Sequence, residues 1–317
     1  MSEFDIRIYC IPSEAGTHFA GQSKAPDAFL YKAKFGLKLA SIGCKVVSTV
    51  PKFFPHETAQ WVPAEKINGV RNEQNAFNVL KFTHTFLTAP YLIEPRFPIF
   101  LGGDCSITPA VFSSFTRWHQ GKRAGLLYMD GDADLTLPSQ TTAEGSSGIL
   151  DSMVMSHLTR RKGGLKSMEI FSQPDGSSLV NPENTVLFGF DPLQPATEHW
   201  VYLLENGFKA FTRPSVQADP IGCATKALQW LESRVDVIML HFDVDVIDSG
   251  MFPLANYPHY AGLEFEQAMS AINVFLKSRK VMGLVITEVN PNNDPNGWMV
   301  EKLVDSLVQS FKNRKNA

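Results

Sequence analysis

The sequence predicts an α/β fold in which helices cover both faces of a mostly parallel β-sheet. Short apolar segments alternate with longer helical patterns along the chain, which is typical of parallel sheets. Several apolar segments show no polar alternation, as expected for strands that are buried on both faces. The composition agrees, because 44% hydrophobic and 19% charged residues are typical of a globular chain with a large core.

Seven apolar segments are expected to form strands. They are residues 6–11, 45–50, 99–101, 126–129, 185–188, 235–242 and 282–286. Residues 72–87 and 263–276 carry apolar side chains at helical spacing. At the C-terminus, Asp294-Pro295 predicts an N-cap followed by proline at the first helical position, with an apolar stripe over residues 298–311 that packs on the sheet.

Length and charge limit the organisation and the partners of the protein. No repeat or low-complexity linker divides the chain, so residues 1–317 are expected to form a single domain. A net charge of −3 gives no basic excess, and nucleic acid is therefore not expected as a partner. We expect a cytoplasmic protein without a membrane span, since the cysteines are scattered and neither a signal peptide nor a long apolar stretch is evident.

Acidic clusters follow four of the predicted strands. They are Gly102-Gly103-Asp104-Cys105-Ser106, Asp130-Gly131-Asp132-Ala133-Asp134, Asp243-Val244-Asp245-Val246-Ile247-Asp248 and Glu288-Val289-Asn290-Pro291. In a parallel α/β sheet, ligands collect beyond the carboxyl ends of the strands. Two carboxylates about 4 Å apart repel by roughly 4 kcal/mol at an effective dielectric constant of about 20. The clusters therefore indicate either a bound cation or protonated carboxyl groups.

The spacing within two of the clusters suits a shared cation. If the backbone stays extended, alternating residues such as Asp130 and Asp132, or Asp243 and Asp245, direct their side chains to the same side. That arrangement favours a carboxylate that bridges two divalent ions. The alternative interpretation is that these aspartates only form turns and helix N-caps, and it is the weaker one because two such clusters occur.

The ordered motifs resemble those of the arginase, agmatinase and formiminoglutamase family, the ureohydrolases. GGDCS, DGDAD, SGILDSM, DVDVID and EVNP stand in the order of the family's GGDHS, DAHxD, GNxHG-like, DxD and EVNP-like elements. The resemblance runs from about residue 6 to residue 310. It implies a three-layer α/β/α fold with a mostly parallel, arginase-like eight-stranded sheet. It also implies a pair of manganese ions and a hydroxide between them that attacks a guanidinium or related carbon.

Carried over residue by residue, the resemblance assigns the following roles. Asp130, Asp134, Asp243 and Asp245 match metal ligands, and Glu288 matches the acid that faces the guanidinium group of the substrate. Cys105 and Asp132 stand where the family has two histidine ligands, so both enter the predicted ligand set. Asp151 stands where arginases have a proton-shuttling histidine, and together with Glu288 it is the predicted catalytic residue.

These substitutions do not determine which metal ion the site would bind. The carboxylate of Asp132 favours hard ions such as Mn²⁺ or Mg²⁺, whereas a Cys105 thiolate favours Zn²⁺ or Fe²⁺. We expect one or two Mn²⁺ ions first, with Mg²⁺, Zn²⁺, Ni²⁺ and Fe²⁺ as alternatives. His241, just before Phe242-Asp243, is interpreted as a satisfied core histidine rather than a partner of a ligand carboxylate. His157, if helical, should point away from the site.

Three hypotheses of function follow. The first is a metal-dependent hydrolase of a linear C–N bond in a small guanidino, amidino or formimino compound, with little activity on arginine. The second is a catalytically inactive arginase-like protein, and the third is a recruited Mg²⁺-dependent enzyme that acts on a phosphorylated substrate. Residues 140–147 and 190–199 are expected to recognise the substrate. The resemblance also implies a possible trimer or hexamer.

Overall fold

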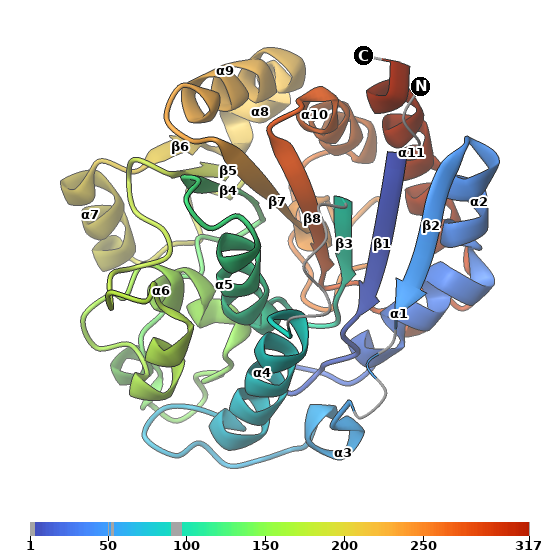
Figure 1. Cartoon of the computed structure of the whole chain (residues 1–317). Coiled ribbons are helices and arrows are strands. Elements are labelled where there is room, and N and C mark those ends of the chain that lie inside the picture. Colours follow the sequence, from blue (N-terminus) through green and yellow to red (C-terminus); the bar gives the residue numbers. More distant parts are fainter. Residues whose placement is uncertain (1–3, 50, 52–53, 90–96, 317) are drawn as a thin grey trace.

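The computed structural model of the protein describes residues 4–49, 51, 54–89 and 97–316. A single eight-stranded sheet crosses it in the order β2-β1-β3-β8-β7-β4-β5-β6, and the strand pairings are parallel (Figure 1). The strands are β1 (Phe4–Cys10), β2 (Cys44–Thr49), β3 (Phe97–Leu101), β4 (Ala124–Met129), β5 (Thr185–Phe188), β6 (Lys209–Phe211), β7 (Val237–Asp243) and β8 (Val281–Thr287). The predicted parallel α/β fold is confirmed.

The seven predicted strands correspond to β1–β5, β7 and β8, with small shifts at their ends. Val50, predicted as the last residue of the second strand, lies outside the described residues. Strand β6 was not predicted; it has only three residues, all half-buried, at the edge of the sheet. A segment of this length is too short to show a strand pattern.

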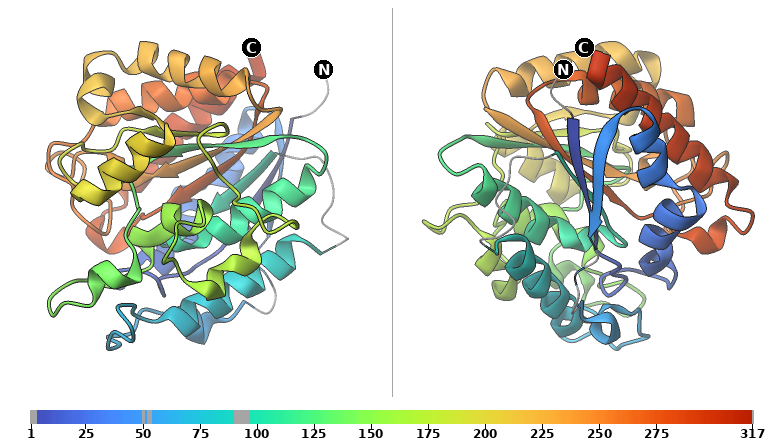
Figure 2. Two further views of the ribbon diagram at one scale, coloured as in Figure 1. Left: turned by 90° about the vertical axis from the view of Figure 1, so that its left-hand side faces the viewer. Right: turned by 45° about the vertical axis from the view of Figure 1, so that its right-hand side comes forward.

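Helices cover both faces of the sheet, as the three-layer prediction requires (Figure 2). The α-helices are α1 (Ala25–Asp27), α2 (Phe35–Ser41), α3 (His56–Ala59), α4 (Glu73–Leu87), α5 (Thr108–Trp118), α6 (Val154–Leu158), α7 (Thr197–Asn206), α8 (Arg213–Ala218), α9 (Pro220–Glu232), α10 (Phe265–Lys277) and α11 (Trp298–Asn316). Alternate residues of β4 face opposite sides of the sheet. Leu127 and Met129 belong to the hydrophobic core on the side covered by α9, α10 and α11. Leu126 and Tyr128 belong to the hydrophobic core on the side covered by α4 and α5.

The last helix begins later than predicted. The predicted N-cap at Asp294 is wrong in position, because Pro291–Asn293 form a 3₁₀ turn and α11 starts at Trp298. Asp294 nevertheless caps the helix from outside, since its carboxylate accepts a hydrogen bond of 2.9 Å from the Val300 backbone N–H. The predicted apolar stripe packs on the sheet through buried side chains such as Leu303 and Phe311.

The strand-to-helix turn after β3 has the cap that its sequence favours. The Asp104 carboxylate accepts from the Ser106 backbone N–H at 3.1 Å and begins a short 3₁₀ turn, Cys105–Ile107, which leads into α5. Pro109 lies in the first turn of that helix, where its missing N–H costs nothing. This turn places Cys105 at the carboxyl edge of the sheet.

Candidate metal centre

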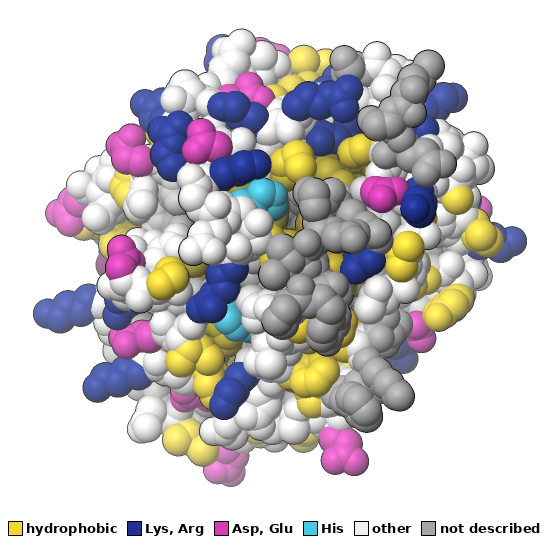
Figure 3. Space-filling view, in the orientation of Figure 1, with side chains coloured by type: hydrophobic (Ala, Val, Ile, Leu, Met, Phe, Trp, Pro, Cys, Tyr) yellow, Lys and Arg dark blue, Asp and Glu magenta, His cyan; other side chains and the backbone are white. Residues whose placement is uncertain are grey.

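All eight residues predicted for the metal and catalytic sites line one pocket of about 300 Å³. They are Cys105, Asp130, Asp132, Asp134, Asp151, Asp243, Asp245 and Glu288. The pocket lies where β3, β8, β7 and β4, which are neighbours in the sheet, end. On the face of the molecule in Figure 3, by contrast, acidic side chains are spread among basic and uncharged ones. The fold thus concentrates carboxylates at one interior point.

The loop after β4 delivers three aspartates by turning back on itself. The Asp132 backbone N–H donates to Asp130 Oδ1 at 2.7 Å, and Asp134 has a left-handed backbone with φ of 47°. The Tyr128 hydroxyl, still within the strand, donates to Asp134 Oδ2. Gly131 is required here, because a Cβ at this position would lie 2.9 Å from the Asp245 carbonyl oxygen.

The aspartates after β7 are arranged in the same way. Asp243 ends the strand, and Asp245 lies in a 3₁₀ turn, Val244–Val246, where its N–H donates to Asp243 Oδ1 at 3.0 Å. Thr287 of β8 donates its hydroxyl to Asp243 Oδ2 at 2.9 Å. The backbone is therefore not extended through either cluster, so the condition for the same-side arrangement is not met. The carboxylates converge because the chain turns, and each first aspartate accepts the N–H of the residue two positions later.

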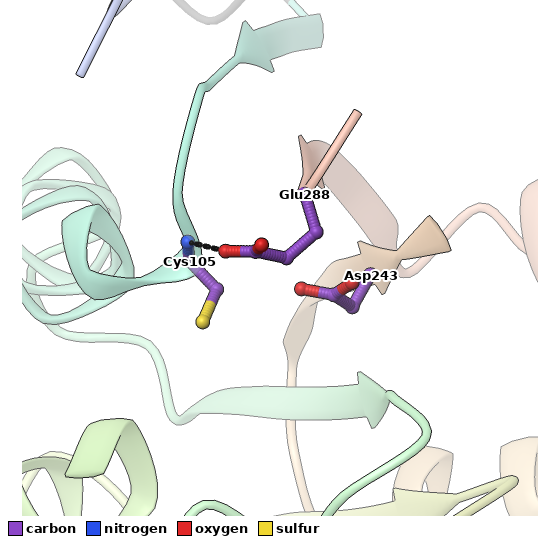
Figure 4. Close-up of side chains that lie close together, drawn as sticks. All are labelled: Cys105, Asp243 and Glu288. Carbon is purple, nitrogen blue, oxygen red and sulfur yellow. Dashed lines mark hydrogen bonds between the residues drawn. The ribbon is translucent and has the colours of Figure 1, made fainter. Parts of the chain in front are cut away.

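Cys105, Asp243 and Glu288 reach the pocket from three different segments (Figure 4). Glu288 follows β8 and has a left-handed backbone with φ of 64°. Its Oε1 accepts from the Cys105 N–H at 2.8 Å, and its Oε2 accepts from the Gln22 side chain. The Cys105 thiol lies 3.8 Å from Asp134 Oδ2 and 3.5 Å from the Asp151 carbonyl oxygen. Both oxygens of the predicted substrate-facing acid are thus engaged by the protein.

Burial and mutual repulsion favour the neutral forms of most of these groups. Burial raises the pKa of Asp130, Asp134, Asp151, Asp243 and Glu288 well above the ordinary value, and neighbouring carboxylates add to the shift. The same causes raise the pKa of the Cys105 thiol. A bound cation would reverse this tendency, since it favours the ionised ligand.

His259 is the main site residue that the sequence analysis missed. Its Nε2 lies 3.2 Å from Asp245 Oδ2 and 3.7 Å from Asp132 Oδ2. Burial disfavours its charge, but Asp245 and Asp132 outweigh that effect and raise the pKa of His259 to about 9. Burial likewise opposes ionisation of Asp245, yet His259 holds its pKa below the ordinary value. No motif surrounds His259, so no sequence signal pointed to it.

Aromatic and polar side chains complete the mouth of the pocket. His18 and Tyr257 stack with ring centroids 5.0 Å apart and an interplanar angle of 21°, and both line the pocket. Ser147 and Gln194 also line it, and they come from the two segments in which substrate recognition was predicted. His157 lies in α6 and lines a separate cavity, so the prediction that it points away from the site is confirmed.

The buried His241 differs from its prediction in one respect. Its Nδ1 lies 3.1 Å from the Thr108 hydroxyl, but its Nε2 has no hydrogen-bond partner among the described residues. The ring is therefore buried yet only half satisfied. Burial lowers the pKa of His241 to about 3, so the ring is neutral at neutral pH.

The donor atoms fit a divalent cation. Two groups of three bring their ligand atoms within 4.8 Å of one another: Cys105, Asp243 and Glu288, and Asp130, His241 and Asp243. Asp243 belongs to both groups, as a carboxylate that bridges two ions would. Oxygen donors with one nitrogen and one sulfur suit first-row divalent ions. The ligand roles themselves stay predictions.

Comparison with known proteins agrees with this architecture. The arginase family model matches residues 4–311. An arginase of Staphylococcus aureus (strain COL) is 28% identical over 310 residues, which is 96% of each chain. The arginase of Entamoeba histolytica superposes with a TM-score of 0.82 at 19% identity over 100% of both chains. The formimidoylglutamase of Bacillus subtilis superposes with a TM-score of 0.70 at 14% identity, over 99% of this chain and 88% of the formimidoylglutamase chain.

Fold and family model together define an α/β protein of the ureohydrolase class. The chain belongs to the arginase family, and its sheet is the arginase-like one that was predicted. Among the described residues, no helix has the length and apolar character needed to cross a membrane.

Proposed function

We propose that the protein is a metal-dependent hydrolase of a linear C–N bond in a small guanidino, amidino or formimino compound, and that it is not an ordinary arginase. One observation carries the proposal. Six buried carboxyl groups and the half-buried Asp132 line a single pocket with Cys105. Those carboxyl groups belong to Asp130, Asp134, Asp151, Asp243, Asp245 and Glu288.

A cation is the physical reason for such a pocket. One protonated histidine offsets the charge of only one carboxylate, so His259 alone does not neutralise the group. One or two divalent ions held by Asp130, Asp132, Asp134, Asp243 and Asp245, with Cys105, would do so. When bound, such ions lower the pKa of water and thereby supply a nucleophile at neutral pH. Mn²⁺ is the ion we propose first, and Mg²⁺, Zn²⁺, Ni²⁺ and Fe²⁺ are the alternatives to test.

The residues around the ions suit a small cationic substrate. A volume of about 300 Å³ is at the lower end of ligand pockets. The acidic lining attracts a guanidinium or amidinium group, and the stacked rings of His18 and Tyr257 offer a face for it at the mouth. Glu288 is proposed to bind this group, which requires Gln22 to release it. Binding would thus exchange one buried hydrogen bond for a charge-assisted one.

Asp151 is proposed to handle the proton of the leaving amine. Burial and the nearby Asp104 raise the pKa of Asp151, so its carboxyl group keeps a proton to higher pH than an ordinary aspartate does. The Thr17 side chain and the Ser152 N–H orient it. A carboxyl group is shorter than an imidazole and differs in charge, which supports a substrate other than arginine.

A second candidate, a catalytically inactive family member, is favoured by His259. Its imidazolium lies between Asp245 and Asp132, where it partly neutralises the pocket without any metal. A protein whose carboxylates are partly neutralised by a histidine depends less on a bound metal ion for its stability. Binding of a small molecule or another chain would then be its function.

The test is hydrolysis of a panel of guanidino, amidino and formimino compounds after loading with Mn²⁺, Mg²⁺, Zn²⁺, Ni²⁺ or Fe²⁺. We expect ion-dependent release of amine or urea from at least one compound, and little from L-arginine. Asp243→Asn should abolish it, whereas Asp248→Asn, which changes an acid of the same segment outside the pocket, should not. Failure of every compound with every ion would favour the inactive candidate, and ordinary arginine turnover with Mn²⁺ would contradict the proposal.

Two further parts of the proposal concern the whole protein. The four cysteines are free thiols, which supports the proposed cytoplasmic location in a reducing compartment. A homotrimer or homohexamer is proposed from the family alone.

A further inference from the structure

His241 is held in a fixed orientation directly beneath the carboxylates. It lies in β7 two residues before Asp243, and its side chain is fully buried. The Tyr128 ring of the neighbouring strand stacks on it at 4.4 Å with an interplanar angle of 4°. Thr108, the first residue of α5, holds Nδ1 at 3.1 Å. Packing and one hydrogen bond therefore aim Nε2 in one direction.

The Nε2 atom of His241 faces the Oδ2 atom of Asp130. The two atoms are 3.7 Å apart, which is too long for a hydrogen bond. Both are buried, and neither has a hydrogen-bond partner among the described residues. An unsatisfied buried polar atom is destabilising, so two that face each other indicate a missing third group. Since two ligand atoms of one ion, each about 2.1 Å from it, lie roughly 3.0–4.2 Å apart, their separation fits a shared cation.

We propose that His241 is a nitrogen ligand of a divalent ion that Asp130 and Asp243 also hold. The three ligand atoms lie within 4.8 Å of one another. The proposal rests on the metal dependence in the proposed function, but adds a ligand that the family resemblance does not assign. Nε2 must then be free of its proton, so Nδ1–H donates to the Thr108 hydroxyl and fixes the tautomer.

This ligand would compensate for the altered motifs of the chain. Cys105 and Asp132 stand where the family pattern has imidazoles, and His241 returns one imidazole from within a strand. A nitrogen donor shifts the preference from Mg²⁺ toward Mn²⁺, Fe²⁺, Ni²⁺ or Zn²⁺. Because the same Asp243 also approaches Cys105 and Glu288, a second ion beside the first would share it.

The test reads the ligand directly, without enzyme activity. The full chain is loaded with Mn²⁺, and electron spin echo envelope modulation is recorded at natural abundance and with ¹⁵N-labelled histidine. We expect a nitrogen coupling that changes with the label, which requires no variant. In His241→Ser the coupling should vanish and the Mn²⁺ dissociation constant should rise at least tenfold. His18→Gln and His259→Gln, which change the two histidines that line the pocket, should keep the coupling.

The outcomes separate this proposal from the function. Manganese bound without nitrogen coupling, or with a coupling that survives in His241→Ser or is lost in His259→Gln, overturns the His241 assignment and leaves the hydrolase proposal standing. Nitrogen coupling without turnover of any compound supports the ligand while the hydrolase proposal fails. If no divalent ion binds, both fail. Should His241→Ser not fold, Thr108→Val, which removes the hydroxyl that holds Nδ1, is expected to weaken both coupling and affinity.

Discussion

Asp134 and Glu288 both have left-handed backbones, with φ of 47° and 64°. This conformation costs about 1 kcal/mol or more for a residue other than glycine, and it persists only where neighbours hold it in place. Tyr128 holds the Asp134 carboxylate, and the Gly103 carbonyl accepts the Glu288 N–H at 2.8 Å. Two acids of the pocket thus have an energetically unfavourable backbone conformation, which is typical of a functional site.

His259 yields a prediction at the same scale. In His259→Gln, Asp245 and Asp132 lose their cationic neighbour, so we expect the metal-free protein to lose roughly 2–3 kcal/mol of unfolding free energy near pH 7. Urea unfolding in the presence of a chelator measures the loss. Saturating Mn²⁺ should reduce it, since the ion replaces the lost positive charge.

The control for this change is His56→Gln, because His56 is exposed at the start of α3. Its unfolding free energy should stay within about 0.5 kcal/mol of wild type. Equal stability of the His259 variant and wild type would contradict the geometry of the ion pair.

The turn between β3 and α5 carries a prediction at the scale of elements. A Cβ at Gly103 would lie 1.6 Å from the Ser13 carbonyl oxygen, which already accepts the Asp104 N–H at 3.0 Å. Gly103→Ala must therefore displace the turn that positions Cys105. We expect a loss of about 3 kcal/mol or more in unfolding free energy and weaker Mn²⁺ binding, measured by chemical unfolding and calorimetric titration.

A glycine in α2 provides the matched control. At Gly36 an added Cβ would meet its nearest neighbours, Ser48 and Val46, at an ordinary 3.7 Å. Gly36→Ala should leave stability unchanged or raise it by up to about 1 kcal/mol, because alanine favours helices. Similar losses in both variants would show that the turn after β3 is not specially constrained.

For the whole molecule, we propose that residues 1–317 form a single domain. One sheet spans the described chain, and the first strand packs against the last helix, since the Phe4 and Phe311 rings are 6.3 Å apart. We therefore expect one cooperative transition in scanning calorimetry, without a separate N-terminal or C-terminal step.

The same scans give the pH dependence of the metal-free protein. The raised pKa values of Asp130, Asp134, Asp151, Asp243 and Glu288 mean that their contribution is present below about pH 4 and is lost as pH rises. His259 acts in the same sense, because its stabilisation is lost as pH rises through about 9. Buried histidines whose pKa burial lowers act in the opposite sense below about pH 6.5. The melting temperature with chelator should therefore fall from about pH 7 to pH 9, where only the carboxyl groups and His259 still contribute to the change.

Divalent ions should flatten this decline, since they bind the ionised pocket. At about 100 times the dissociation constant, one ion adds roughly 2.7 kcal/mol. An Asp243→Asn variant should show a shallower decline with chelator and a smaller gain with Mn²⁺. A melting temperature that rises between pH 7 and pH 9 in the metal-free protein would contradict the burial of these carboxyl groups.

Much of the architecture could be predicted because it depends on local patterns. Continuous apolar segments predicted β3, β4 and β5, and the acids after four strands predicted where the pocket would lie, since parallel strands end at one edge. β6 could not be found, because three half-buried residues carry no periodic signal. The start of α11 was misplaced because Asp294 caps it across a turn rather than from the N-cap position.

The amino-acid sequence by itself determined the layered fold, the family motifs and the set of acids at the carboxyl edge, because strand pattern and residue type are local properties. Only the tertiary structure decided which groups meet those acids. His259 lies in a loop that follows Asp245 in the sequence and contains no recognisable motif. The fold nevertheless places its ring between two carboxylates. The sequence predicts that His241 is a core residue. Its proposed role as a ligand depends on an Nε2 atom that faces Asp130. Charge compensation depends on distances across the pocket, and such distances exist only once the strands have come together.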